Sequence, residues 1–228
     1  MTEARPTFLD GLTASLPIVM GYFPISFSFG VAATRAGFTG IEATALSVII
    51  YAGASQFLAL ALLSSGAPVL VSAFTLIAMN LRHLLYGPAL MREAGEAAET
   101  RHAWAWAWGL TDEVFGQALG ALARGQRFSE PSMFGLGLGA YAAWISGTIA
   151  GAYAGSGALE GWPAVNAGLG FMLPALFLAL LLSILNRRQL PVIAVAGAVT
   201  VIATLTISAT SGILLGMLAG AIAGVLRK

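Results

Sequence analysis

Long apolar runs separated by short polar connections dominate the hydrophobic pattern of this chain. The runs are continuous and lack the alternating segments of about ten residues that a membrane β-barrel shows. A helix needs about 20 apolar residues to cross the hydrocarbon core, and most of the runs reach that length. The pattern predicts transmembrane helices in eight segments: Leu12–Ala36, Ile41–Gly66, Val69–Leu90, Ala103–Ala123, Met133–Ala154, Ala164–Leu185, Val192–Ser208 and Gly212–Leu226.

The number of spans depends on the last two runs, which are shorter than the others. They form either two spans or one long broken helix, so the chain has eight or seven spans. In both cases the fold is an all-α, polytopic transmembrane helix bundle, because lipid cannot satisfy unpaired backbone groups. No connection is long enough for a separate soluble domain, so residues 1–228 form a single integral membrane domain.

A weak internal sequence similarity, called the internal echo below, suggests a duplication. Gln56–Leu60 resembles Leu176–Leu180, and the same offset places the first three spans on the fifth, sixth and seventh. Because transporters are often built from such repeats, residues 12–123 and 132–226 are the predicted halves. The alternative is a chance match between two Leu- and Ala-rich strings.

The composition restricts the environment and the partners. Of the 228 residues, 58% are hydrophobic and only 9% are charged, against about 25% charged residues in a soluble domain. The solvent of this chain is therefore mostly lipid. The net charge of +1 provides no basic patch, so nucleic acid is not expected as a partner. Two His and no Cys exclude a disulfide framework and any Cys-based metal site, and no cofactor is expected.

The distribution of Arg and Lys between loops predicts the orientation. In the eight-span arrangement with an inside N-terminus, the inside carries Arg5, Arg124, Arg127, Arg187, Arg188, Arg227 and Lys228. The outside carries Arg35, Arg92 and Arg101. Cytoplasmic loops are enriched in these residues, so both termini are predicted to be cytoplasmic. The first ten residues are polar and are expected to form a short tail, not a cleavable signal peptide.

Prolines and a glycine interrupt the first span. Pro17, Gly21 and Pro24 fall within one apolar run. An internal proline removes a backbone hydrogen bond and clashes with the preceding turn, so the helix should kink or unwind near the middle of the membrane. Freed N–H groups at that depth hold carboxylates in many transporters, which makes this segment a candidate substrate site. A purely structural kink is the alternative.

Isolated polar residues mark the second and third spans. Gln56 brings an amide into an apolar stretch, where it should face the bundle interior as a ligand contact or as a link between helices. Asn80 and His83 share one face of the third span, and Arg82 lies beside them. An Arg inside a membrane segment costs about 2.5–3.5 kcal/mol by insertion scales. Arg82 is therefore a candidate functional residue, unless it snorkels to the interface.

Two acids occupy the middle of the fourth span. Asp112 and Glu113 follow Thr111 at the centre of an apolar run, and Arg82 is the obvious partner for either carboxylate. The acids could line a pathway, couple protons to transport or form a static ion pair between helices. Tryptophans open the same span, and they are expected to anchor it at the membrane interface: Trp104, Trp106 and Trp108.

Glycines recur every fourth residue in two spans. The two ladders are Gly147, Gly151 and Gly155, and then Gly212, Gly216, Gly220 and Gly224. This spacing leaves one helix face without side chains, so another helix can approach closely. The ladders predict tight packing within this chain or against a second one.

Motifs of intramembrane enzymes are missing from the sequence. The chain has neither the His-Glu-x-x-His of metalloproteases nor the Gly-x-Ser-Gly of rhomboid-type enzymes, and Asp112 lacks an intramembrane Asp mate. A phosphate-binding Gly-x-x-x-x-Gly-Lys-Ser/Thr motif is also missing. The chain is therefore expected not to be an enzyme. Between a channel and a carrier, broken helices with acids at mid-membrane favour a carrier.

Four strings stand out in the first half of the chain: the run from Gly11 to Gly30 with its prolines, Tyr51–Phe57, Asn80–Tyr86 and Thr111–Phe115. In order and spacing they resemble the AzlC family, the large subunit of bacterial branched-chain amino acid exporters. The hydropathy of the remainder also fits the family, which extends the resemblance to nearly the whole chain.

The resemblance implies export of valine, leucine, isoleucine or related amino acids across the bacterial cytoplasmic membrane. It also implies a small hydrophobic partner subunit of the AzlD type. The predicted mechanism is alternating access, driven by the proton-motive force. In it the carboxylate of the substrate meets N–H groups near Gly21–Pro24 and Arg82, and Asp112 or Glu113 takes the ammonium group or the coupled proton. The alternative is a secondary carrier or channel for another small metabolite.

Overall fold

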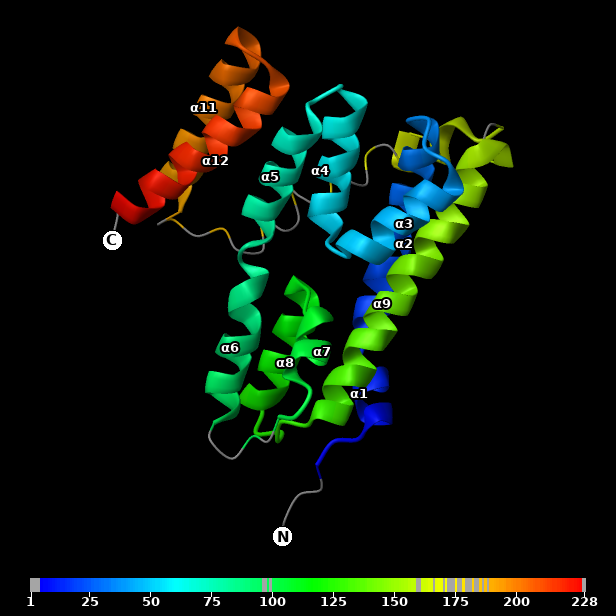
Figure 1. Cartoon of the computed structure of the whole chain (residues 1–228), viewed down its shortest axis with the longest axis vertical. Helices are drawn as coiled ribbons and strands as arrows, with labels where there is room; N and C mark the ends of the chain where they lie inside the picture. The colour runs from blue at the N-terminus through cyan, green and yellow to red at the C-terminus, as the bar shows by residue number, and fades with distance from the viewer. Residues whose placement is uncertain are drawn as a thin grey trace. The chain divides into compact units, whose positions relative to one another are not determined.

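The computed structural model describes residues 5–95, 98, 100–158, 161–165, 167–169, 171, 175, 178, 182, 185, 187 and 189–226. The described residues form helices and no strands, which confirms the all-α bundle. The helices are α1 Phe8–Ala14, α2 Leu16–Arg35, α3 Gly40–Ile50, α4 Gly53–Ser64, α5 Val69–Asn80, α6 His83–Ala94, α7 Ala103–Trp108, α8 Asp112–Ala123, α9 Glu130–Tyr153 with a π-helical turn Ala154–Ala158, α11 Leu190–Thr206 and α12 Ala209–Leu226 (Figure 1).

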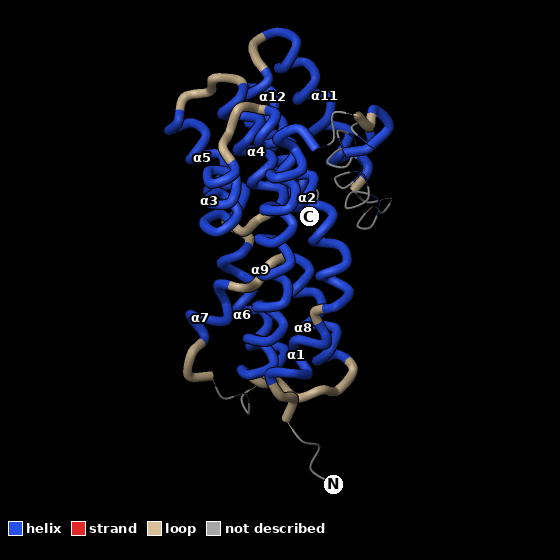
Figure 2. The backbone as a smooth tube through the Cα atoms, turned by 90° about the vertical axis from the view of Figure 1, so that its right-hand side faces the viewer, coloured by secondary structure: helices blue, strands red, loops and turns tan. Residues whose placement is uncertain are grey.

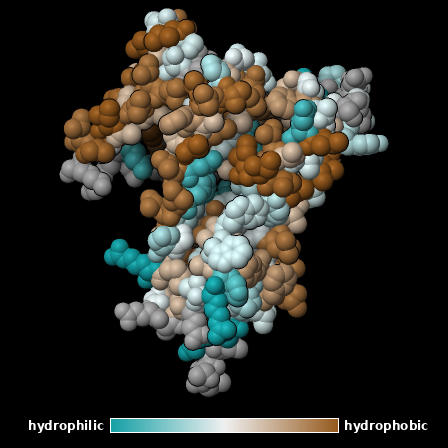
Figure 3. Space-filling model, in the orientation of Figure 1, coloured by the Kyte–Doolittle hydropathy of each residue, from teal (hydrophilic) through white to brown (hydrophobic). Residues whose placement is uncertain are grey.

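Three described helical runs are long and apolar enough to cross a membrane. They are Leu16–Arg35, Val69–Ala94 and Glu130–Tyr153, the second of which joins α5 and α6. Apolar side chains cover much of the surface of α4 and α5, and hydrophilic residues gather near the ends of α6 and α8 (Figure 3). Leu70 and Phe74 on α5 are each more than three-quarters exposed, as expected for side chains that face lipid.

The chain forms two compact units. The first comprises Met1–Leu60 and Leu76–Leu173, and the second comprises Ala61–Thr75 and Pro174–Lys228. Much of the predicted sixth span, and with it most of the second half of the internal echo, lies outside the described residues. The duplication therefore stays a prediction.

The first glycine ladder packs α9 against α2 within this chain. A Cβ at Gly147 would meet the carbonyl oxygen of Phe23, and a Cβ at Gly151 would overlap that of Phe27. Gly155 makes the same kind of approach to Val31. The backbones touch along most of both helices, so α2 and α9 form the central pair of the first unit (Figure 2).

The second ladder packs α12 against α11 in the second unit. Gly212 and Gly216 lie against Thr204 and Thr200, and a Cβ at Gly220 would stand 3.0 Å from that of Ala196. The last member of the ladder, Gly224, has open space beside it. Six of the seven ladder glycines thus contact a helix of this chain, so the close packing predicted from the ladders occurs within the chain.

The segment predicted as the second span folds as two short helices, α3 and α4. Gly40, at the start of α3, lies beside Ala152 near the end of α9, and three turns later Tyr51 reaches Tyr141 in the middle of α9. In α4, Gly53 lies against Trp144 near that middle, and the helix then returns. The pair therefore enters and leaves at one end of α9 (Figures 1 and 2).

The segment predicted as the fourth span is also a returning pair, α7 and α8. Just before α7, the backbone N–H groups of Arg101 and His102 donate to Glu130 at the start of α9. Gly109, after α7, touches Gly137 two turns along α9. The end of α8 leads through a short connection back to Glu130. This pair thus enters from the end of α9 opposite to α3 and α4 (Figures 1 and 2).

The returning pairs change the predicted sides of the loops. Because α3 and α4 together return to the end of α9 from which they started, the connection after α6 lies at the same end of the first unit as the N-terminus. Arg5 and Arg101 line one hollow, and Arg5 shares another with Glu93. The prediction that Arg92 and Arg101 lie on the side opposite Arg5 is therefore wrong.

The first span does not unwind. The helix α2 continues from Leu16 to Arg35 with Pro24 inside it, and Pro17 lies in its first turn, where a missing N–H is harmless. One internal proline removes one hydrogen bond, and the glycine contacts with α9 support the helix on both sides of it. The breaks predicted near Pro24 occur instead between α3 and α4 and between α7 and α8.

Candidate functional site

The start of α8 places both acids at the tip of the second returning pair. Gly109 ends α7, and Thr111 is the N-cap of α8, where its hydroxyl accepts from the N–H of Val114 at 3.3 Å. Asp112 and Glu113 then occupy the first turn, where the unpaired N–H groups and the helix dipole stabilise negative charge. The sequence Thr-Asp-Glu is thus a helix start in the middle of an apolar run.

Asp112 joins α8 to the junction between α5 and α6. Arg82 Nη2 donates to Asp112 Oδ2 at 2.6 Å, and the Tyr86 hydroxyl donates to Oδ1. The ring of Tyr86 stacks on Phe115, one turn further along α8, with centroids 4.6 Å apart. The predicted pairing of Arg82 with one of the acids is confirmed for Asp112. Both side chains are partly exposed, 50% for Arg82 and 36% for Asp112.

Glu113 faces a different helix. The hydroxyl of Tyr22 on α2 lies 2.5 Å from Glu113 Oε2 and 2.5 Å from Thr111 Oγ1. Since a tyrosine has one hydroxyl proton, Tyr22 donates to the carboxylate and takes the threonine hydroxyl as its other partner. Tyr22 is buried, and its ring packs edge-on against Trp144 of α9 at 5.0 Å. The two neighbouring acids therefore link α8 to two different helices.

Aromatic rings connect the tips of the two returning pairs. Tyr51, between α3 and α4, stacks on Trp108 at the end of α7 with centroids 5.7 Å apart, and both rings contact Tyr141 of α9. Tyr51 has a left-handed backbone with φ 39°, which is uncommon for a bulky residue. Such strain persists only where the surroundings impose it, and it is concentrated at functional sites.

The hydroxyl of Tyr51 is buried and has no partner. The residue is 6% exposed, and among the described residues its hydroxyl is the buried side-chain polar atom without a hydrogen bond. The Tyr51 ring stacks on Trp108 at the end of α7, so the hydroxyl belongs to the contact between the two tips. A buried polar group without a partner costs about 1–3 kcal/mol. An orphaned hydroxyl at the contact between the two tips is therefore suited to a polar ligand.

Gln56 lies in a fully paired network behind this tip. Trp144 Nε1 donates to Gln56 Oε1 at 2.6 Å, and Gln56 Nε2 donates to Ser47 Oγ at 2.7 Å. Ser47 in turn bonds Thr148 Oγ1 at 2.7 Å. Gln56 is completely buried. The structure thus places Gln56 in a link between α3, α4 and α9, the structural one of the two roles predicted for it.

The other predicted residues are divided between the centre and the exposed surface. Asn80 Oδ1 accepts from Ser55 at 2.7 Å, and His83 Nδ1 lies 3.2 Å from the Asn80 carbonyl oxygen, so both border the α5–α6 junction. The remaining three lie on the exposed face of α2, and a Cβ at Gly21 would have nothing within 4 Å: Pro17, Gly21 and Pro24. The structure therefore separates this trio from the acids.

Several central residues escaped the sequence analysis because aromatic residues are common in apolar runs. Tyr22 and Tyr86 carry the hydroxyls that bind the acids, and Tyr51 carries the orphaned hydroxyl. The expected role of the tryptophans also needs correction. Trp106 is buried and donates to Glu130 at 3.0 Å, and Trp108 joins the central aromatic contact. Trp104, 79% exposed, remains suited to an interface anchor, and Trp108 is 55% exposed beside its ring contacts.

The fold and the site define an integral membrane protein whose half-helices end at a charged centre. Comparisons with known proteins agree. The family model AzlC protein matches residues 17–158. The inner membrane protein YgaZ of Escherichia coli (strain K12) is 47% identical over 184 residues, which cover 80% of this chain and 75% of that protein. An uncharacterized membrane protein of Archaeoglobus fulgidus is 39% identical over 96% of this chain and 93% of its own length. No solved structure matches.

The chain therefore belongs to the AzlC family, and the expected membership is confirmed. The family and the membrane proteins related to it assign the chain a membrane location and a role in membrane transport.

Proposed function

We propose that this chain is the large subunit of an exporter for branched-chain or related amino acids. The observation that carries the proposal is the convergence of half-helix ends, two acids, an arginine and an orphaned hydroxyl at one place in an apolar bundle. Polar groups are expensive in a membrane interior, and they mark solute or ion pathways. Half-helices with their ends at mid-membrane are a recurring way to build such sites in carriers.

The substrate would bind between the tips of the two returning pairs. The first N–H groups of α4 have no helical partners, so they would hold the carboxylate of the substrate. The sequence pattern predicts this role for the segment around Gly21–Pro24 of α2 instead. Glu113 and the Tyr51 hydroxyl would take the ammonium group. The rings of Trp108 and Tyr141 would contact the apolar side chain.

Asp112 would couple proton movement to the transport of the substrate. In the structure it is bound to Arg82 and Tyr86, on elements separate from those that hold Glu113. Protonation of Asp112 would release Arg82, and this would free α8 to move against α6 during alternating access. The proton-motive force would then bias the direction of transport.

The N-terminal end of α2 would face the cytoplasm. Arg5, Arg92, Arg101, Arg124 and Arg127 are at this end of the first unit, and Arg35 is at the other end of α2. This asymmetry follows the positive-inside rule, and it is clearer than the one predicted from eight spans. A small hydrophobic subunit of the AzlD type is the proposed partner.

Efflux of labelled valine from loaded cells that express both subunits tests the function. We expect Asp112→Asn to reduce the efflux rate at least tenfold at equal expression, because Arg82 loses its charged partner. Glu42→Gln is the matched control, since Glu42 caps α3 through Thr39 and a glutamine can make the same capping bond. Unchanged efflux in Asp112→Asn would remove Asp112 from the mechanism. A panel of labelled solutes that shows no preference for amino acids would contradict the proposed substrate.

A further inference from the structure

A large cavity opens at the arginine-rich end of the first unit. Its volume is about 710 Å³, within the range of about 300–1,000 Å³ typical of small-molecule sites. Side chains of α1, α6, α8 and α9 line it. Its outer part carries Arg124 and Arg127 with Asp10, and its inner part is apolar, with Leu90 and Leu136 at the floor.

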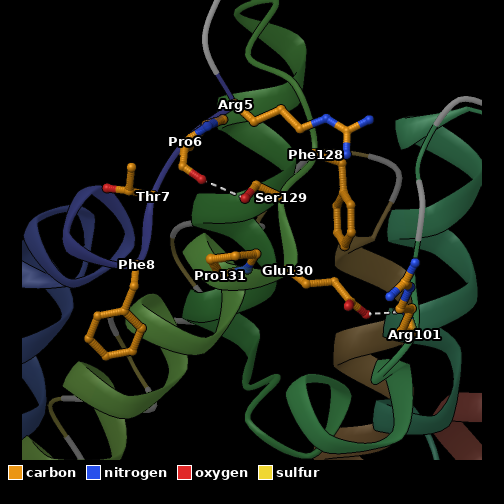
Figure 4. A pocket seen from close by; sticks show the side chains of 9 residues that line it. All are labelled: Arg5, Pro6, Thr7, Phe8, Arg101, Phe128, Ser129, Glu130 and Pro131. Carbon is orange, nitrogen blue, oxygen red and sulfur yellow. Dashed lines mark hydrogen bonds between the residues drawn. The ribbon is translucent and has the colours of Figure 1, made fainter.

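The outer wall of the cavity is held in place by the N-terminal segment. The Ser129 hydroxyl donates to the Pro6 carbonyl oxygen at 2.5 Å, which fixes this segment across the start of α9 (Figure 4). Glu130 lies in the neighbouring hollow and accepts from Arg101, His102 and Trp106, so its charge is already compensated. The cavity therefore has a fixed wall and is not lined by that acid.

The charges of the cavity suit a ligand with a carboxylate. Within the described part of the chain, neither Arg124 nor Arg127 has a hydrogen-bond or salt-bridge partner. Guanidinium groups bind carboxylates through two parallel hydrogen bonds. Hydrogen bonds from the backbone and the hydroxyl of Thr7 lower the pKa of Asp10, so Asp10 is ionised and can face an ammonium group. The apolar floor completes a surface for a zwitterion with a hydrophobic side chain.

The cavity also points toward the central acids. Gln117 lines it, and Glu113 is one turn further on the same face of α8, a rise of about 6 Å. On α6, Leu90 lines the cavity and Tyr86, one turn away, binds Asp112. Leu90 belongs to the buried apolar cluster that contains Tyr22. The cavity thus lies about one helical turn from the central site along both α6 and α8.

We propose that this cavity is a cytoplasmic loading site, in which Arg124 and Arg127 capture the carboxylate of an apolar amino acid before it enters the central site. The inference rests on the proposed export of amino acids and adds a second binding site to it. Its ligand is recognised by its carboxylate, so the same groups could in principle hold the phosphate of an anionic lipid, and the test separates the two.

Uptake of labelled leucine into everted vesicles containing both subunits measures access from the cytoplasmic face. We expect Arg124→Gln with Arg127→Gln to raise KM about tenfold and to leave the maximal rate unchanged, because only capture is lost. Arg35→Gln, at the other end of α2, is the matched control and should keep the original KM. An unchanged KM in the double variant, with normal yield of folded protein, would overturn the loading site.

Competition with leucinamide, which lacks the carboxylate, provides the second readout. Leucine should compete better than leucinamide in the original protein, and this preference should shrink in the double variant. If the effect of the double variant requires anionic lipid and is the same for both compounds, the cavity holds a lipid headgroup and the proposal is wrong.

If the original protein takes up no leucine, the proposed export fails. A leucine-induced thermal shift lost in the double variant would then still support the binding site, and no shift in the original protein would overturn it.

Discussion

The two returning helix pairs have similar shapes and opposite chemistry. Behind the tip of α3–α4, Gln56 is fully buried in a neutral network with Ser47 and Trp144. At the tip of α7–α8, the charged pair of Arg82 and Asp112 is partly exposed. One tip is held by buried neutral hydrogen bonds, and the other is held by a partly exposed ion pair.

This difference indicates which pair is fixed and which can move. A buried network in which each group has a partner is rigid, because breaking any bond leaves an unpaired polar group in an apolar interior. An ion pair that is partly exposed is held by fewer neighbours, so it can exchange its partner for a ligand or a proton. We therefore assign α3–α4 to the scaffold and the start of α8 to the changing part of the transport cycle.

The largest expected effect is the loss of the scaffold network in Gln56→Leu. The substitution leaves the Trp144 indole N–H without a partner, at about 1–3 kcal/mol, and it takes one of the two partners of the Ser47 hydroxyl. We expect a strong drop in the thermal unfolding temperature, which tryptophan fluorescence of the protein in detergent measures. Glu113→Gln at the other tip should lower the unfolding temperature less, because the glutamine oxygen can still accept from Tyr22. Equal losses in both variants would contradict the division into fixed and changing pairs.

A glycine at each tip offers a second comparison. A Cβ at Gly53 would stand 2.7 Å from the Trp144 ring, whereas one at Gly109 would stand 3.4 Å from its nearest neighbours. Overpacking a rigid core costs about 1–3 kcal/mol. Gly53→Ala should therefore lower the unfolding temperature clearly, and Gly109→Ala should lower it little. Tolerance of Gly53→Ala would show that the scaffold tip can relax.

These comparisons show which parts of the fold can be predicted from the sequence. Composition predicts a membrane helix bundle because so few charges cannot cover a water-exposed surface. The glycine ladders predict close helix contacts because a missing side chain has the same effect in any fold, and Gly151 and Gly216 make such contacts. The pairing of Arg82 with Asp112 follows from the cost of isolated charges in lipid.

The returning pairs could not be predicted from hydropathy, because two half-helices contain as many apolar residues as one span. The local signals were present in the sequence. Gly109 followed by Thr111 and two acids is the signature of a helix end and a new helix start. Tyr51 gives no such signal, since its left-handed backbone depends on contacts with Trp108 and Tyr141 that are distant in sequence.

The N-cap of α8 provides a smaller test. Thr111→Ala removes the bond to the Val114 N–H and the contact with Tyr22, and loss of an N-cap costs about 1 kcal/mol. Because the affected tip is the changing one, we expect a modest fall in unfolding temperature and a larger fall in valine efflux. Thr111→Ser is the control, since it keeps the hydroxyl. If stability and efflux fall only in proportion to each other, the cap has no role beyond folding.

The smallest effect on stability is expected at the contact between the two tips. Tyr51→Phe removes a buried hydroxyl that has no partner, so the free energy of unfolding should stay the same or rise by up to about 1 kcal/mol. Tyr22→Phe is the matched control, because its hydroxyl bonds Glu113 and its loss should lower stability by about 1.5–3 kcal/mol. A fall in stability for Tyr51→Phe would mean that its hydroxyl has a partner in the folded protein.

Transport by Tyr51→Phe then decides why an unpaired hydroxyl is kept at a strained position. If the hydroxyl binds the ammonium group of the substrate, efflux should fall about fivefold, the equivalent of one hydrogen bond of about 1 kcal/mol. The loss of rate should come from a higher substrate concentration at half-maximal rate, with the maximal rate kept, because the scaffold around Tyr51 is unchanged. Normal efflux together with normal stability would place the substrate away from Tyr51. The acids at the start of α8 would then bind it without help from the α3–α4 tip, and the fixed pair would serve only to support the changing one.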